Sequence, residues 1–255
     1  MEEIPRDHPR YASLITRQKI VEGFHSGLVV PQGLLAHGRG EAIDYILGEE
    51  THPPAAQATR AAAALLLLSK NPVISVNGNT AALVPDEIVG LSRLLNARIE
   101  VNLFHRSEER VRRIKEYLLS RGAGVVLGDE DLVEIPGLSS QRRFVSKVGI
   151  YGADTVLVPL EDGDRAEKLV ALGKKIIAVD LNPLSRTSRA ATITIVDNVV
   201  RAMPNLCRNV EELRCSAPEE LEKIFLSHNN QENLKRMIEL ILRRLSRLTG
   251  LEELE

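Results

Sequence analysis

The sequence predicts an α/β fold with a mostly parallel sheet, helices on its flanks and further helices at both ends. Short apolar runs rich in β-branched residues recur after residue 70, helical patterns separate most of them, and the runs end on polar side chains. Right-handed crossovers set such strands parallel, so their carboxyl ends meet at one edge. Ligands of open parallel sheets bind at that edge. We therefore expect the binding site there.

The first 70 residues favour helices. Apolar residues interspersed with basic ones predict an amphipathic helix over 11–23. Residues 27–36 are apolar but interrupted by Pro31, and a glycine-rich loop, HGRGEA, then leads into another helix. Two glycines flank Arg39 in this loop and would let the backbone approach a ligand, although a packing role explains them equally well. The alanine-rich segment 53–68 is apolar on all sides, which predicts a helix buried against the sheet.

The middle of the chain alternates strands and helices. Strands are expected at 73–76, 99–103, 125–127 and 155–158, and helices at 86–96, 108–121 and 165–172. Residues 129–150 are less regular and mix acidic, basic, proline and glycine residues, which favours a loop followed by a helix.

The segment 175–198 carries the strongest functional signal. Its pattern is typical of two strands, 176–179 and 193–196, joined by a polar turn. The turn and the strand ends hold acids, amides, hydroxyls and guanidinium groups: Asp180, Asn182, Ser185, Arg186, Thr187, Ser188, Arg189, Asp197 and Asn198. Guanidinium and hydroxyl groups suit phosphate, and carboxylates or amides at strand ends can hold ribose or a base. This composition favours a nucleotide, although such residues are also common in turns that bind nothing.

Two other polar segments follow predicted strands. Residues 77–80, Asn-Gly-Asn-Thr, follow one strand, and the acidic sequence Glu161-Asp162-Gly163-Asp164 follows another. Carboxylate oxygens suit Mg²⁺. An acidic helix start explains the second segment equally well, because the helix dipole favours acids there.

The C-terminal quarter has no strand pattern. Residues 199–218 suggest an irregular connector that holds both cysteines. Beyond it, apolar residues recur at spacings of four and three along one charged helix: Leu234, Ile238, Ile241, Leu245 and Leu248. This narrow stripe either packs on the sheet domain or meets its copy in a homodimer. We expect one α/β domain over 1–255, with a helical region over about 1–70, a sheet core over about 71–200 and a helical extension over about 201–255.

Composition excludes several classes of protein. The formal net charge of -2 and the aromatic content of 3% argue against a nucleic-acid binder. Two cysteines, Cys207 and Cys215, cannot form a disulfide framework or a four-cysteine zinc site, although one bridge between them stays open. A charged N-terminus with prolines and the absence of a long apolar run lead us to expect a soluble cytoplasmic protein without a membrane partner. A P-loop motif is absent from the sequence, which argues against a P-loop NTPase.

Four segments together resemble one known family. SVNGNTAALVP, HGRGEA, VPLEDGDR and VDLNPLSRTSRAATITIVDN are similar to segments of the archaeal 4-phosphopantoate--beta-alanine ligases, also called phosphopantothenate synthetases. The similarity extends from about residue 4 to the segment after Asn198, and it implies a homodimer with a Rossmann-like fold. The implied reaction joins 4-phosphopantoate and beta-alanine with ATP to give 4-phosphopantothenate, AMP and diphosphate, on the route to coenzyme A. The resemblance implies ATP contacts at Arg17, Arg39, Asp180, Leu181, Asn182, Arg186, Thr187, Asn198 and Val199.

Roles follow from the implied reaction as expectations. Arg17, Arg39 and Arg186, with Mg²⁺, would stabilise charge on the phosphates while an acyl-adenylate forms. The phosphate of phosphopantoate would lie at Asn77, Gly78, Asn79 and Thr80 and at Arg189. His37, Asp162 and Asp164 are candidates for the group that receives or faces the amine. Two alternatives are a nicotinamide-dependent oxidoreductase, which the weak glycine fingerprint disfavours, and a non-catalytic nucleotide-binding module.

Overall fold

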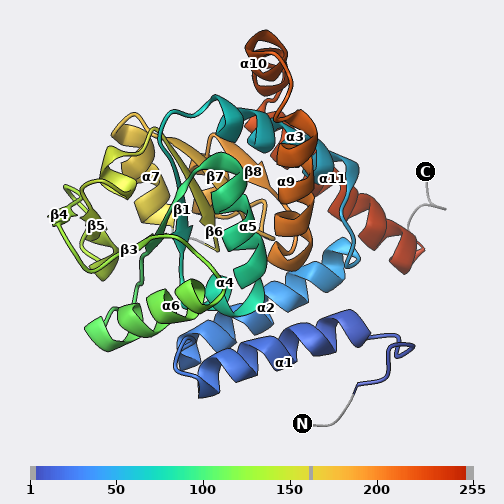
Figure 1. Cartoon of the computed structure of the whole chain (residues 1–255). Coiled ribbons are helices and arrows are strands. Elements are labelled where there is room, and N and C mark those ends of the chain that lie inside the picture. Colours follow the sequence, from blue (N-terminus) through green and yellow to red (C-terminus); the bar gives the residue numbers. More distant parts are fainter. Residues whose placement is uncertain (1–3, 161–162, 251–255) are drawn as a thin grey trace.

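A six-stranded parallel sheet forms the centre of the molecule (Figure 1). The computed structural model describes residues 4–160 and 163–250. The strands are β1 (Pro72–Val76), β2 (Arg98–Val101), β3 (Val126–Leu127), β6 (Thr155–Pro159), β7 (Lys175–Val179) and β8 (Ile193–Ile195). Their order is β3-β2-β1-β6-β7-β8, and every neighbouring pair is parallel. The predicted α/β class is confirmed, and the order reverses between β1 and β6 as it does in Rossmann folds.

Both faces of the sheet are covered, which explains why most residues of the strands are apolar. All five residues of β1 are buried, and alternate residues enter different cores, with Ile74 on one side and Val73 on the other. One face packs on α3 (Pro53–Leu68), α5 (Pro85–Leu95), α6 (Glu108–Ser120) and α9 (Val199–Leu213). The other face packs on α7 (Gly163–Ala171) and on the segment between β3 and β6. The predicted buried helix over 53–68 is confirmed, because α3 buries six of its seven alanines and two leucines completely or nearly so.

The first two helices of the chain lie below the sheet in Figure 1. The first, α1 (Tyr11–His25), confirms the predicted helix and is two residues longer. The second, α2 (Pro31–Leu47), corrects the prediction of an apolar segment and a glycine-rich loop, since Gly38, Arg39 and Gly40 lie inside it. Pro31 does not interrupt the segment but starts the helix, because the first helical position needs no N–H and its φ is already fixed.

The segment 129–150 contains a small antiparallel pair and no α-helix, contrary to the prediction. Strands β4 (Leu132–Glu134) and β5 (Phe144–Ser146) pair, and two 3₁₀ turns, η1 (Gln141–Arg143) and η2 (Ile150–Gly152), complete the segment. A buried carboxylate holds it on the sheet. Glu100 of β2 accepts hydrogen bonds from the N–H groups of Ser146 (2.9 Å) and Ile150 (2.6 Å). Such long-range capture of backbone groups leaves no pattern in the sequence.

The predicted irregular connector over 199–218 is mostly the helix α9. Asn198 caps its N-terminus. Its buried positions follow the helical period: Val199, Ala202, Met203, Leu206, Val210 and Leu213. Pro204 within the helix and the two cysteines obscured this pattern. Cys207 and Cys215 are free thiols, so the bridge left open by the sequence does not form here.

Two further helices follow, α10 (Pro218–Leu226) and α11 (Asn230–Thr249). The first half of α11 packs on the domain, because Leu234 and Met237 are buried and Ile241 packs beside them. The C-terminal end of the predicted apolar stripe is exposed to solvent, since Leu245 is 42% and Leu248 is 72% exposed. Among the helices of residues 4–160 and 163–250, none combines the length and apolar character needed to cross a bilayer.

Candidate active site

A cavity of about 610 Å³ opens at the carboxyl edge of the sheet. The ends of β1, β2, β6, β7 and β8 form one side of it, and α2 forms the other. The lining includes Gln32, His37, Arg39, Gly40, Glu41, Ile43, Asn77, Gly78, Asn79, Phe104, His105, Arg110, Arg142, Leu160, Asp180, Leu181, Asn182, Ser185, Thr187, Asn198 and Val199. The position at the reversal of strand order is the one expected for a ligand in an open α/β sheet.

The segment after β1 ties the two halves of the sheet together. Asn77 accepts a hydrogen bond from the Thr80 N–H (3.0 Å) and caps the short helix α4 (Gly78–Leu83). Its amide also donates to the carbonyls of Pro159 (3.1 Å) and Leu160 (3.0 Å), which follow β6. A Cβ at Gly78 would lie 2.1 Å from the Leu28 carbonyl oxygen, so only glycine fits this approach. Asn77, Gly78 and Asn79 line the cavity, whereas Thr80 is fully buried and is not part of the lining.

The turn after β7 is organised by its own side chains. Asp180 accepts hydrogen bonds from the Asn182 N–H (2.9 Å) and the Ser185 hydroxyl (2.5 Å). Burial raises the pKa of Asp180, and these hydrogen bonds and the charge of Arg39 oppose the rise. Ser185 in turn caps the short helix α8 (Arg186–Ala190). Asp180, Asn182 and Thr187 therefore lie at the cavity in a fixed arrangement.

The helix α2 brings an acid, a base and a cation to the same cavity. Arg39 lies near enough to Asp180 for its charge to lower the pKa of that carboxyl group. Burial lowers the pKa of His37, which favours a neutral imidazole. Glu41 accepts two hydrogen bonds from Arg17 Nε (2.8 and 2.9 Å). Arg17 of α1 thus does not line the cavity itself and reaches it only through Glu41.

Two arginines form a cationic end of the cavity that the sequence did not reveal. Arg110 of α6 donates from Nε to the Leu28 carbonyl (2.9 Å) and from Nη1 to the His105 carbonyl (2.7 Å). Burial and the nearby charge of Arg142 lower the pKa of Arg110 to about 10. Asn102 positions the backbone of Arg142 by donating to its carbonyl (3.3 Å). Arg110 lies on a charged helix, where its sequence position is typical of a surface residue, so no sequence pattern indicated its role.

Several predicted site residues lie away from the cavity. Arg186 is exposed and pairs with Glu167 (2.7 Å) and with Asp164 (3.6 Å). The cavity lining does not include Arg186, Glu167, Asp164 or Arg189. Asp162 lies outside the residues that the structure describes, as does Glu161. Within the described part of the chain, groups of three or more His, Cys, Asp or Glu residues suited to a metal ion are absent.

Fold and cavity together define the class as an α/β protein with a Rossmann-type sheet and a cavity at its reversal point. The glycines around Arg39 lie in the interior of α2 rather than in a strand-to-helix loop, so they do not form a dinucleotide fingerprint.

Comparison with known proteins identifies the family within this class. The family model of phosphopantothenate/pantothenate synthetases matches residues 54–244, and the chain belongs to that family. A 4-phosphopantoate--beta-alanine ligase of Methanosarcina mazei is 53% identical over 238 residues, which cover 93% of this chain and 94% of the relative. A protein of the same name from Thermococcus kodakarensis is 52% identical over 249 residues, covering 97% and 95%. Another, from Methanospirillum hungatei, is 54% identical over 210 residues, covering 82% and 86%.

Proposed function

We propose that the protein is an ATP-dependent ligase that joins 4-phosphopantoate and beta-alanine in coenzyme A biosynthesis and releases AMP and diphosphate. The names of its relatives support the ligase class and the substrates. One structural observation carries the proposal: a single cavity has a polar end built from strand termini and a cationic end built from two arginines. Its volume of about 610 Å³ lies in the usual range for small-molecule sites, roughly 300–1,000 Å³.

The nucleotide occupies the polar end. Asp180, Asn182 and Asn198 offer carboxylate and amide groups for ribose and base, while Leu181 and Val199 supply apolar contact. Arg39 faces this end from α2 and stabilises charge on the phosphates. Arg186 is not part of the lining, but it is adjacent in sequence to Thr187, which is. We propose that the Arg186 side chain leaves Glu167 and Asp164 and turns to the phosphates when ATP binds.

The phosphate of 4-phosphopantoate occupies the cationic end. Arg110 and Arg142 lie close enough for the charge of one to lower the pKa of the other, and a dianionic phosphate between them relieves that repulsion. Asn77, Gly78 and Asn79 lie between the two ends and contact the substrate there. Arg189, which the sequence also suggested for this phosphate, is exposed and lies outside the lining.

The reaction proceeds in two substitutions, of which the first activates the carboxylate and the second forms the amide. A carboxylate oxygen of phosphopantoate attacks the α-phosphorus of ATP, and the bond to diphosphate breaks. The amine of beta-alanine then attacks the acyl carbon, the bond from that carbon to the AMP oxygen breaks, and the amine proton passes to a base. His37 suits this role because burial favours its neutral form. Asp164 is a weaker candidate, since it pairs with Arg186 outside the cavity.

Magnesium and the homodimer belong to this proposal in a limited form. The described residues do not include a cluster of three or more His, Cys, Asp or Glu side chains that could hold a metal ion. The ion ordinarily keeps several waters and binds through substrate phosphates, so it arrives with ATP. We propose a homodimer from the family resemblance, with the exposed leucines at the end of α11 available for such an interface.

The identity of the nucleotide product tests the proposal. Purified protein is incubated with ATP, 4-phosphopantoate and beta-alanine, and the nucleotides are separated by chromatography. We expect AMP and diphosphate in equal amounts with phosphopantothenate. Formation of ADP and inorganic phosphate would instead indicate an acyl-phosphate route and overturn the adenylate step. ATP binding without product would favour the non-catalytic module, and NADH binding would favour the oxidoreductase.

A further inference from the structure

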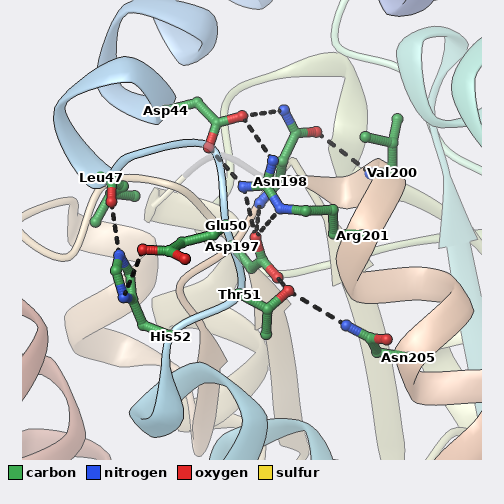
Figure 2. Close-up of polar contacts among 10 residues, drawn as sticks. All are labelled: Asp44, Leu47, Glu50, Thr51, His52, Asp197, Asn198, Val200, Arg201 and Asn205. Atoms are coloured by element: carbon green, nitrogen blue, oxygen red, sulfur yellow. Dashed lines mark hydrogen bonds and ion pairs between the residues drawn. The ribbon is translucent and has the colours of Figure 1, made fainter. Parts of the chain in front are cut away.

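Asn198 is held at the nucleotide end of the cavity by contacts at both ends of its carboxamide (Figure 2). Its Nδ2 donates to Asp44 Oδ2 (2.7 Å), and its Oδ1 accepts from the Val200 N–H (3.3 Å). A reversed amide would set its NH₂ against an N–H donor and its oxygen against a carboxylate. The side chain is therefore confined to one orientation, with its remaining hydrogen-bonding capacity left for a ligand.

Asp44 is itself fixed by Arg201, which bridges two buried carboxylates. The Arg201 guanidinium donates to Asp44 from Nη2 (2.5 Å) and Nη1 (3.1 Å), and its Nε donates to Asp197 Oδ1 (2.8 Å). Asp44 and Asp197 are only 5% and 2% exposed. Asp197 also accepts from the Asn198 N–H (2.7 Å) and from the Thr51 hydroxyl (2.5 Å). Bidentate, charge-assisted contacts of this kind set geometry as well as energy.

The network joins two elements that face each other across the nucleotide end. Asp44 lies on α2, directly after Ile43 of the lining, whereas Arg201 lies in the first turn of α9. Loss of the pair would release α2 from the end of β8 and would free the Asn198 amide to rotate. Neither Asp44 nor Arg201 belongs to the lining, so any effect on ligand must pass through Asn198 and α2.

We infer that Asp44 and Arg201 are positioning residues that fix Asn198 and the spacing between α2 and the end of β8 for nucleotide binding. This inference rests on the proposed function. It predicts that affinity for ATP depends on a buried ion pair that does not contact the nucleotide. Small displacements of positioning groups are sufficient to cause large losses of ATP affinity.

Isothermal titration of ATP into the full chain tests the inference. Asp44→Asn keeps the shape of the side chain, but its NH₂ must face a donor of Arg201 or Asn198. We expect ATP to bind about 100-fold more weakly. Arg201→Lys keeps the charge and loses the planar fork, so a smaller loss is expected. In turnover assays the KM for ATP should rise more than kcat falls, since neither residue touches the reacting atoms.

Asp154→Asn is the matched control. Asp154 precedes β6 at the opposite, amino end of the sheet, where it accepts from the N–H groups of Lys70 (2.7 Å) and Asn71 (3.2 Å). This variant should lower the melting temperature and leave ATP affinity unchanged.

The outcomes separate the inference from the proposed function. If Asp44→Asn and Arg201→Lys bind ATP as tightly as the unaltered chain, the network is purely structural and the inference is wrong. Should Asp44→Asn not fold, Arg201→Lys alone decides by the same criterion. An unaltered chain that does not bind ATP would overturn the proposed function itself.

Discussion

Replacement of Arg110 by methionine gives the sharpest test of the cationic end of the cavity. Methionine keeps an apolar stem of similar length and removes the guanidinium group. Nε and Nη1 of Arg110 already donate to the carbonyls of Leu28 and His105. Nη2 is therefore the nitrogen best placed to donate to a phosphate. One hydrogen bond to a charged group contributes about 2 kcal/mol, which corresponds to roughly a 30-fold change in affinity.

The assay compares two substrates that differ only in the phosphate. The ratio of kcat/KM for 4-phosphopantoate to that for pantoate should fall by roughly 30-fold in Arg110→Met, the factor for one such bond. Arg113→Met is the matched control, because Arg113 lies on the same helix and pairs with Glu109 at the exposed surface. It should leave the ratio unchanged. The melting temperature is followed in parallel, since Arg110→Met also leaves two carbonyls without their donor.

Equal losses for both substrates would refute the assignment. Such a result would mean that Arg110 supports the loops around Leu28 and His105 without contacting the phosphate. An unchanged ratio of the two kcat/KM values with normal activity would also refute the assignment. In that case Arg142 would be the residue to test for phosphate binding.

Two further predictions concern Arg186 and Glu100. Arg186→Ala should lower kcat by about 100- to 1,000-fold if the guanidinium stabilises charge on ATP. It should barely change the melting temperature, because solvent screens an exposed ion pair such as that with Glu167. A large drop in melting temperature with normal kcat would contradict this. Burial raises the pKa of Glu100 to about 7, so between about pH 4.5 and pH 7 the folded state holds a proton that the unfolded state has lost. The free energy of unfolding should therefore fall by about 3 kcal/mol as pH rises through this window. Denaturant titrations at several pH values should show a weaker pH dependence of this free energy in Glu100→Gln than in the unaltered chain. If the two proteins show the same pH dependence, Glu100 does not titrate in this way.

The sheet could be predicted from the sequence because its strands are buried on both faces. Residues 176–179 are all apolar, and residues 73–76 are apolar except for Ser75. Both runs are rich in β-branched residues, and each became a strand. The missed elements have local features that compete with their periodicity. Pro31 suggested a break although it starts α2, and Pro204 suggested irregular structure although it lies within α9. In both cases the sequence pattern did not reveal where the proline lies relative to the start of the helix.

The site was predictable only where it is built from strand ends. Asp180, Asn182 and Asn198 follow strands directly, and their arrival at one edge is a consequence of parallel topology. Arg110 and Arg142 come from a helix face and from the segment around β4 and β5. Their proximity depends on how Asn102 and Glu100 hold that segment against the sheet. Interactions between residues 40 or more positions apart have no signature in a single sequence.

The reversal of strand order also explains why two ligands of different chemistry would meet here. On one side of it, β7, β8 and α2 supply the polar groups that we assign to the nucleotide. On the other side, α6 and the β4–β5 region supply the two arginines that we assign to the substrate phosphate. The hydrogen bonds from Asn77 to Pro159 and Leu160 cross this boundary. A carboxylate placed near Asn77 would have its phosphate toward one half and the α-phosphorus toward the other. Because each half has its own binding groups, Arg110 should affect phosphopantoate binding, and the Asp44–Arg201 pair should affect ATP binding. In a chain that carries both Arg110→Met and Asp44→Asn, the losses of binding free energy should therefore be additive.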